Sequence, residues 1–227
     1  MISIILPAYR EADRIGHTIP AIKATAKAHP IEMLVVDAAS RDGTAEIAEK
    51  AGARKISSKI KGRAVQMNLG AAQASGEFLL FLHADTRLPE DFASPVLNAF
   101  REGAAGGCFR LSFDHSHWFL KGCAWFTRFD INAVRFGDQG LFVRKEVFLQ
   151  IGGFRETLKL MEDQESIHRI KKYGRFRILP ACVVTSARKY LRNGIYRLQG
   201  IFFLIWLLYY AGVSQEKLVK LYQQLVK

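Results

Sequence analysis

Residues 78–85 read FLLFLHAD, an apolar run that passes directly into a histidine and an aspartate. Two earlier segments have a similar form: residues 2–7 read ISIILP, and residues 32–37 read EMLVVD. Strands without polar alternation are buried on both faces, which is typical of a parallel sheet covered by helices. The sequence therefore predicts an α/β fold.

Amphipathic stretches separate these apolar runs. Ile15, Ile19 and Ile22 recur at helical spacing, and residues 44–52 predict a short helix that ends at a glycine. Further along we expect strands over residues 54–57, 106–113 and 140–146, and helices over residues 63–74, 90–103 and 162–173. Residues 116–130 suit either an aromatic helix or a loop.

Polar residues follow the predicted strands where each one ends. Residues 7–9 read PAY, Asp37 closes the second run, and residues 83–85 read HAD. In open parallel sheets, ligands bind beyond the carboxyl ends of the strands. The Asp85 carboxylate suits Mg²⁺ or Mn²⁺, which prefer oxygen ligands and often also bind substrate phosphates. An acid at a strand end is also common as a helix cap or a solvated residue, so the residues alone leave the role of Asp85 open.

Several short motifs occur in a fixed order. They are IILPAYRE at residues 4–11, VVDAASRDGT at 35–44, GRA at 62–64, NLG at 68–70, ASGE at 74–77 and HAD at 83–85. This series resembles the family 2 glycosyltransferases with a GT-A fold. The similarity continues more loosely through GGF at residues 152–154 and ED at residues 162–163.

The resemblance implies a Rossmann-like, mostly parallel sheet flanked by helices. It divides the chain into a GT-A domain over residues 1–190 and a helical C-terminal segment over residues 191–227. Residues 1–88 would bind the nucleotide, and residues 89–190 would face the acceptor. The implied activity is an inverting transfer of a sugar from a nucleoside diphosphate sugar to a hydroxyl or carboxylate acceptor, assisted by Mn²⁺ or Mg²⁺.

The resemblance also assigns roles to individual residues. Asp163, or its neighbour Glu162, would be the general base, and Asp85 would bind the metal. His83, Asp138, Gln139 and Arg188 are expected to contact the diphosphate or the acceptor. The nucleotide contacts would come from Pro7, Ala8, Tyr9, Glu11, Asp37, Ser40, Arg63 and Ala84.

Two departures from the family pattern stand out. His83 occupies the place of the first acid of the usual Asp-x-Asp motif, so the metal would depend on Asp85 almost alone. Of the usual Asp-Asp-Gly-Ser segment, only Asp37 and Ser40 remain. Two alternatives stay open: His83 contacts the diphosphate or simply packs, and Glu162 and Asp163 suit a helix N-terminus even without a catalytic role.

Charge and aromatic content suggest the kind of partner. There are 33 basic and 21 acidic side chains, a formal charge of +12, which favours an anionic partner. A basic segment precedes residues 201–213, an apolar stretch too short for the ~20 residues that span a bilayer. This part of the chain suits a peripheral membrane surface, packing within the protein or a homodimer, or nucleic acid. We expect no nucleic acid, because no recognition motif is present. The aromatic residues of 118–129 suit a core or a lipid-like acceptor.

Compartment and function class follow from weaker signals. Three cysteines without a CxxC pair favour a reducing compartment, and residues 1–13 resemble a strand rather than a secretory signal. We therefore expect a cytoplasmic protein, with the inner face of the membrane as a peripheral position. Two other functions remain open: a sugar-phosphate nucleotidyltransferase, and a non-enzymatic module that binds membranes or nucleic acid. The first normally needs a glycine-rich loop after the first strand, where this chain has AYRE.

Overall fold

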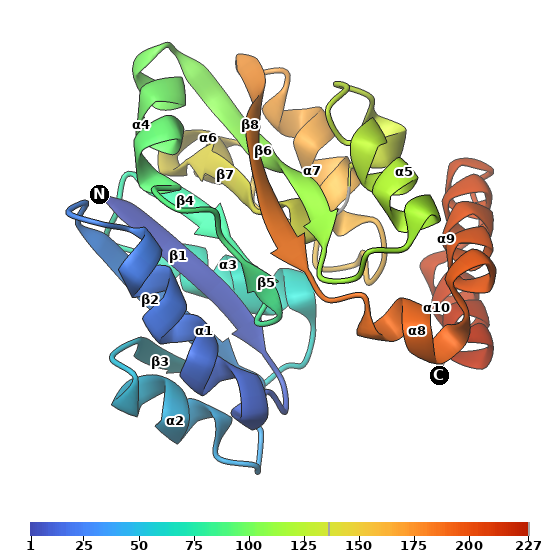
Figure 1. Cartoon of the computed structure of the whole chain (residues 1–227), viewed down its shortest axis with the longest axis horizontal. Helices are drawn as coiled ribbons and strands as arrows, with labels where there is room; N and C mark the ends of the chain where they lie inside the picture. The colour runs from blue at the N-terminus through green and yellow to red at the C-terminus, as the bar shows by residue number, and fades with distance from the viewer. Residues whose placement is uncertain (136, 227) are drawn as a thin grey trace.

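One mixed sheet of eight strands runs through residues 1–135 and 137–226, the part of the chain that the computed structural model describes (Figure 1). Strands β1, β2, β3 and β4 pair in parallel, whereas β7 is antiparallel to both β4 and β6. The predicted α/β class is therefore confirmed. The sheet order is β3-β2-β1-β4-β7-β6-β8-β5, with strands β1 (Ile2–Ala8), β2 (Ile31–Asp37), β3 (Arg54–Ser57), β4 (Phe78–Phe81), β5 (Thr86–Arg87), β6 (Ala104–Phe113), β7 (Leu141–Arg144) and β8 (Arg175–Thr185).

The helices lie on both faces of this sheet, and the last three gather at one side of the molecule (Figure 1). The predicted domain boundary at residue 190 falls inside α8, and the division stays a prediction. The helices are α1 (Ala12–Thr25), α2 (Thr44–Lys50), α3 (Arg63–Gln73), α4 (Ala93–Arg101), α5 (Trp118–Phe126), α6 (Lys145–Gln150), α7 (Glu162–Ile170), α8 (Arg188–Asn193), α9 (Ile195–Tyr210) and α10 (Gln215–Leu225), with 3₁₀ turns η1 (Asn132–Val134) and η2 (Gly137–Gln139).

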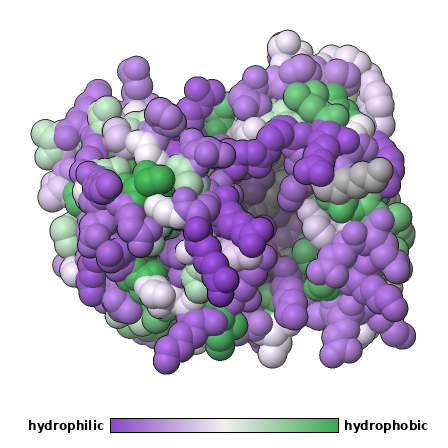
Figure 2. Space-filling view, turned by 90° about the horizontal axis from the view of Figure 1, so that it is seen from below, coloured by the Kyte–Doolittle hydropathy of each residue, from purple (hydrophilic) through white to green (hydrophobic). Residues whose placement is uncertain are grey.

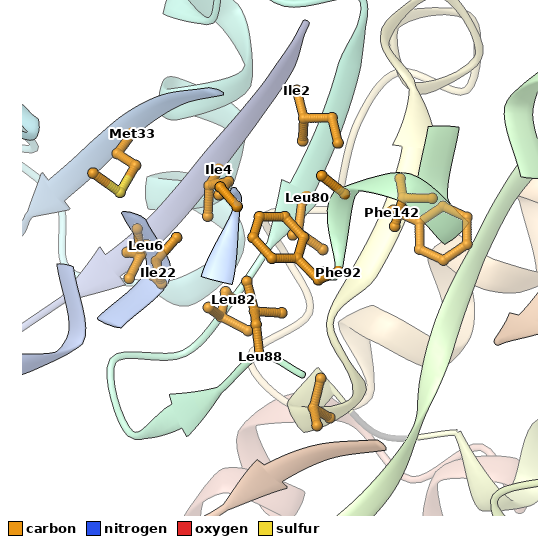
Figure 3. Packing of buried hydrophobic residues seen from close by; sticks show 14 of the residues in the cluster. Ile2, Ile4, Leu6, Ile22, Met33, Leu80, Leu82, Leu88, Phe92 and Phe142 are labelled. Carbon is orange, nitrogen blue, oxygen red and sulfur yellow. The ribbon is translucent and has the colours of Figure 1, made fainter. Parts of the chain in front are cut away.

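Strand β1 contributes to two hydrophobic clusters, one on each face of the sheet. Ile4 and Leu6 pack in one cluster with Ile15 of α1, and Figure 3 shows part of this packing. Ile5 points to the opposite face and packs in the other cluster with Met67 of α3. Since burying one such side chain contributes roughly 1.5–3 kcal/mol, covering both faces fixes the helices against the sheet.

Strand β8 is the one long element that the sequence pattern did not predict. It pairs in parallel with β6, and its register shifts where Phe109 faces Leu179 and Arg110 faces Cys182. The residues skipped on β8 include Pro180, and proline is tolerated in a strand at such a bulge because its missing N–H breaks no ladder bond. A basic, proline-containing segment thus forms a strand through its tertiary pairing.

None of the helices in the described part of the chain is long and apolar enough to cross a membrane. The longest apolar helix, α9, has 16 residues.

Candidate active site

The carboxyl ends of β1, β2 and β4 lie at one edge of the sheet, because these strands are parallel neighbours. Figure 2 views the molecule from this side and shows a hollow surrounded mainly by hydrophilic residues. The ends of these strands and the loops that follow them carry all of the predicted nucleotide contacts except Arg63. The topology thus confirms that these segments share one edge.

Asp37 has one carboxylate oxygen engaged and one free. Its side chain is only 4% exposed, and Oδ2 accepts a hydrogen bond of 2.8 Å from the backbone N–H of Ser40. Oδ1 is buried without a hydrogen-bond partner among the described residues. An unpaired buried acceptor is costly, so Oδ1 is suited to receive a donor group from a ligand.

The loops after β1 and β2 are tied together by side chains. Ser40 Oγ accepts a hydrogen bond of 2.9 Å from the backbone of Arg10, and Thr44 Oγ1 accepts one of 3.0 Å from the backbone of Glu11. The Glu11 carboxylate pairs with Arg14 at 2.6 Å. Through these contacts, Ser40 and Glu11 stabilise the conformation of the two loops.

Gln66 of α3 is a supporting residue that sequence reasoning missed. Its amide Nε2 donates to the carbonyls of Ala8 at 2.8 Å and Val36 at 2.7 Å. It is buried and joins the ends of β1 and β2 next to Asp37. A glutamine on the inner face of a helix among alanines was the signal that could have identified it.

Tyr9 presents its ring toward basic side chains. The ammonium of Lys61 lies 3.5 Å from the ring centroid, and the guanidinium of Arg10 lies 5.3 Å from it. Pro7 and Tyr9 are half-buried, and Ala8 is buried. The edge therefore combines an aromatic surface with positive charge.

The HAD segment after β4 faces the other half of the molecule. Thr18 Oγ1 donates to the carbonyl of Ala84 at 2.7 Å, and His83 Nε2 lies 3.6 Å from Asp138 Oδ1. Burial, together with the nearby Arg63 charge, lowers the pKa of His83 to about 3. His83 is therefore a neutral imidazole.

Arg63 links the two halves of the site. It begins α3, and its Nη1 lies 3.2 Å from Glu162 Oε1 and 3.6 Å from Asp163 Oδ2. Both carboxylates are buried at the start of α7, with 2% and 8% of their surface exposed. Met161, just before them, has a φ of 68°, a left-handed conformation that non-glycine residues rarely adopt. Such strain clusters at functional sites.

Burial and like charge act against ionisation in this cluster. Burial and the neighbouring Glu162 raise the pKa of Asp163 to about 8, although Arg63 opposes the shift. Partial burial likewise raises the pKa of Asp138, again opposed by Arg63. The Arg63 side chain is 46% exposed, and although partial desolvation opposes the shift, Glu162 and Asp163 raise its pKa and keep it charged. Carboxylates with raised pKa values beside a fixed cation are candidates for proton transfer.

The C-terminal helices add a cation that the sequence did not single out. Lys189 of α8 interacts electrostatically with His83 and Asp138, and its Nζ donates a hydrogen bond of 3.0 Å to the hydroxyl of Tyr222. Its neighbour Arg188, the predicted diphosphate contact, is an exposed residue at the start of the same helix. The basic segment was visible in the sequence, but which of its residues faces the site depends on the angle of α8.

Gln139 is directed toward the sheet. Its side chain is buried and donates to the carbonyl of Phe109 at 3.1 Å. Phe136, which lies just before Asp138 and Gln139 in the sequence, is outside the described residues. The structure thus brings Asp138 near His83, whereas Gln139 supports β6 from the adjacent turn.

The residues near Asp85 fit a divalent cation that is shared with a substrate. The Asp85 carboxylate is half-buried and has no hydrogen bond or ion pair within the described part of the chain, and the neutral imidazole of His83 lies two residues before it. No cluster of three or more His, Cys, Asp or Glu residues suited to a metal occurs among the described residues. A carboxylate and an imidazole suit Mn²⁺ or Mg²⁺ only when substrate oxygens complete the coordination shell.

A surface cavity of ≈ 380 Å³ lies beside the loop that precedes α3. It is lined by Ser58, Lys59, Ile60, Val65, Asn68, Leu69 and Glu156. None of these is a predicted site residue, although the backbone N–H of Ser58 donates to the Asp37 carbonyl at 2.8 Å. The cavity is therefore connected to the strand edge through Ser58.

Solved structures share this fold at low sequence identity. Mannosyltransferase PcManGT from Pyrobaculum calidifontis, solved with GDP-Man and Mn²⁺, has a TM-score of 0.73 and 18% identity, covering 90% of this chain and 61% of that chain. S. aureus TarS has a TM-score of 0.68 and 18% identity, covering 87% of this chain and 38% of that chain. These similarities confirm the predicted GT-A fold.

Curated relatives match a shorter region. Glycosyltransferase AglE of Haloferax volcanii is 36% identical over 93 residues, 37% of this chain and 30% of that protein. The putative teichuronic acid biosynthesis glycosyltransferase TuaG of Bacillus subtilis is 30% identical over 99 residues, 40% of this chain and 38% of that protein. The matched part is thus well under half the length of either relative.

A family model described as glycosyl transferase family 2 matches residues 3–155, more than half of the sequence. The matched region contains the strand-end motifs and every predicted nucleotide contact. The expected glycosyltransferase class is therefore confirmed at the level of the family: this chain belongs to glycosyl transferase family 2.

Proposed function

We propose that this protein transfers a sugar, with inversion at the anomeric carbon, from a nucleoside diphosphate sugar to a hydroxyl or carboxylate acceptor. The observation that carries the proposal is the contact of Arg63 with Glu162 and Asp163. This contact places the guanidinium of Arg63, at the strand edge, next to the buried carboxylates of Glu162 and Asp163 in the C-terminal half of the chain. A departing diphosphate needs the cation, and an incoming hydroxyl needs the base.

The nucleoside would occupy the edge formed by the loops after β1 and β2. The free Oδ1 of Asp37 would accept a hydrogen bond from the base, and the Tyr9 ring would border the base or ribose. Pro7, Ala8, Glu11, Ser40 and Ala84 complete the predicted surroundings, with Lys61 now added by its contact with Tyr9. The relatives solved with GDP-Man and with UDP-GlcNAc support a donor of this class.

Cations would stabilise the diphosphate that leaves. Arg63 is permanently charged, and Lys189 approaches the same region from α8. Asp85 and His83 would hold Mn²⁺ or Mg²⁺ together with the donor phosphates. The bound metal would supply positive charge to the departing phosphate oxygen.

Asp163 would act as the general base. The acceptor oxygen attacks the anomeric carbon, the bond from that carbon to the diphosphate oxygen breaks, and the acceptor proton passes to the carboxylate. A base whose pKa is raised toward neutral pH accepts a proton more readily than an ordinary aspartate. Glu162 would maintain this raised pKa, and Asp138 would lie toward the acceptor.

The acceptor and the cellular position are part of the same proposal. Exposed aromatic residues and a basic C-terminal segment favour a lipid-like acceptor and a peripheral position at the inner face of the membrane. A homodimer through the C-terminal helices is the alternative use of that surface.

The activity can be tested by identifying the nucleotide product. Wild type and Asp163→Asn are incubated with a panel of nucleoside diphosphate sugars, Mn²⁺ and membrane lipid extract, and the products are separated by chromatography. We expect release of a nucleoside diphosphate that falls at least ~10³-fold in the variant, the loss typical of removing an essential catalytic group. Pyrophosphate as the product would instead indicate a nucleotidyltransferase and overturn the proposal.

A further inference from the structure

Two helices expose apolar faces to solvent. On α9, exposed residues recur three or four positions apart, as expected for one side of a helix. On α5 and the turn after it, exposed aromatic residues do the same. We call the combined surface the α5–α9 face; it consists of Trp118, Trp125, Phe126, Phe129, Tyr196, Phe203, Leu204, Leu207 and Tyr210.

The two helices meet, so their exposed residues form one surface. The rings of Trp118 and Tyr196 lie 6.3 Å apart, although 69% of Trp118 and 55% of Tyr196 is exposed. Figure 1 shows α5 and α9 on the same side of the molecule. Contiguous exposed apolar surfaces of this kind mark sites of interaction.

The charged residues within the two segments that carry the α5–α9 face are all basic. Residues 115–129 and 186–214, which carry all nine residues of the face, contain no acidic residue. Asp114 and Asp130 flank the first range, and Asp130 is paired with Lys171 at 2.6 Å. The guanidinium of Arg128 lies 4.6 Å from the ring centroid of Trp125, at the face itself. The basic residues of the two segments are Lys121, Arg128, Arg188, Lys189, Arg192 and Arg197. A partner that covers this face must therefore accept both apolar and cationic groups.

We propose that the α5–α9 face docks on the surface of an anionic lipid bilayer. Tryptophan and tyrosine favour the boundary between headgroups and acyl chains, and nearby lysine and arginine are attracted to anionic headgroups. A second copy of the chain fits less well. A symmetric contact through this face would bring identical cations together, and neither segment offers a carboxylate to pair with them.

Docking in this way would place the active site beside the membrane. Helix α8 precedes α9 directly, and its Lys189 interacts with His83 and Asp138 in the site. An acceptor held in the bilayer would thus lie near the sugar donor. This inference deepens the proposed function and, for the acceptor, rests on it.

The test is vesicle flotation of the full chain with phosphatidylcholine vesicles that contain or lack phosphatidylglycerol. We expect flotation only with the anionic vesicles, weakened by added salt because the attraction between charges is screened. Phe203→Ser with Leu207→Ser, or Trp118→Ser with Trp125→Ser, should raise the lipid concentration for half-binding by about tenfold or more. Leu149→Ser is the matched control, since Leu149 is 58% exposed on α6, outside the face.

Separate measurements distinguish failure of this inference from failure of the proposed function. Calorimetry with a nucleoside diphosphate should give the same affinity for the face variants as for wild type, because these residues lie outside the nucleotide site. Flotation without nucleotide binding would support the docking surface and oppose the transferase proposal. The docking inference is overturned if wild type does not float, if the face variants float as well as wild type, or if ultracentrifugation shows a dimer that the variants abolish.

Discussion

The guanidinium of Arg63 lies 3.2 Å from the carboxylate of Glu162, across the boundary between the two halves of the chain. The same guanidinium nitrogen lies 3.6 Å from Asp163. One arginine therefore compensates two buried carboxylates that would otherwise repel each other. If Arg63 also faces the diphosphate, then donor binding and the protonation state of the base are coupled through this side chain.

Replacing Glu162 with glutamine should move the pH dependence of transfer. Glu162 is a neighbouring negative charge that raises the pKa of Asp163, so its removal lowers that pKa. Activity that needs ionised Asp163 rises with pH up to about 8 in wild type, and this rise should shift to lower pH in Glu162→Gln. The measurement is kcat/KM across pH at saturating metal. An unchanged profile would show that Asp163 does not limit the rate.

The two neighbouring cations of α8 should differ in their effect. Lys189→Ala removes the charge that interacts with His83 and Asp138, and we expect kcat/KM to fall roughly 10²-fold, as for other electrostatic contacts to a developing charge. Arg188→Ala should change it by less than about threefold. Steady-state kinetics of both variants measure this difference, and a larger loss in Arg188→Ala would support Arg188 as the diphosphate contact.

Asp85 should couple metal and nucleotide binding. We expect wild type to bind a nucleoside diphosphate more tightly in Mn²⁺ than in EDTA. The ratio of these two affinities should be at least ~10-fold smaller in Asp85→Asn. Thr18 holds the backbone of Ala84 beside it, so the loop should keep its shape in the variant. Equal metal dependence in both proteins would remove Asp85 from the metal site.

Much of the N-terminal half could be predicted because its signals are local. Residues 78–81 and the two earlier apolar runs form buried strands, and Arg54–Ser57 forms β3 as expected. Their parallel pairing then brings Asp37 and the HAD segment to one edge. Neither conclusion required knowledge of distant contacts.

The rest depended on contacts between distant parts of the chain. β8 contains a proline and two arginines, and it is a strand because β6 pairs with it across a bulge. Lys189 interacts electrostatically with His83 and Asp138 because of the way α8 packs. The link from Gln66 to the ends of β1 and β2 likewise follows from packing. Hydrophobic periodicity in the sequence does not predict these three long-range contacts.

Gly107 should not tolerate a side chain. A Cβ at this position would collide with the carbonyl oxygen of Arg177 and with the ring of Phe142 on the neighbouring strands. Gly107→Ala should therefore lower the free energy of unfolding by about 1–3 kcal/mol. The matched control is Gly122→Ala on α5, where no atom lies within 4 Å of the new Cβ and the helix gains up to ~1 kcal/mol. Thermal unfolding of both variants would show opposite shifts in Tm.

The most direct test of the account is calorimetry with UDP, GDP and dTDP, each with and without Mn²⁺. The account predicts that one nucleotide binds best, that Mn²⁺ tightens its binding, and that Asp37→Asn weakens it by at least about tenfold. Asp130→Asn, which alters an exposed carboxylate paired with Lys171 away from the loops after β1 and β2, should bind as wild type does. If none of the three nucleotides binds, or if Asp37→Asn binds them as tightly as wild type, the proposed nucleotide site is contradicted.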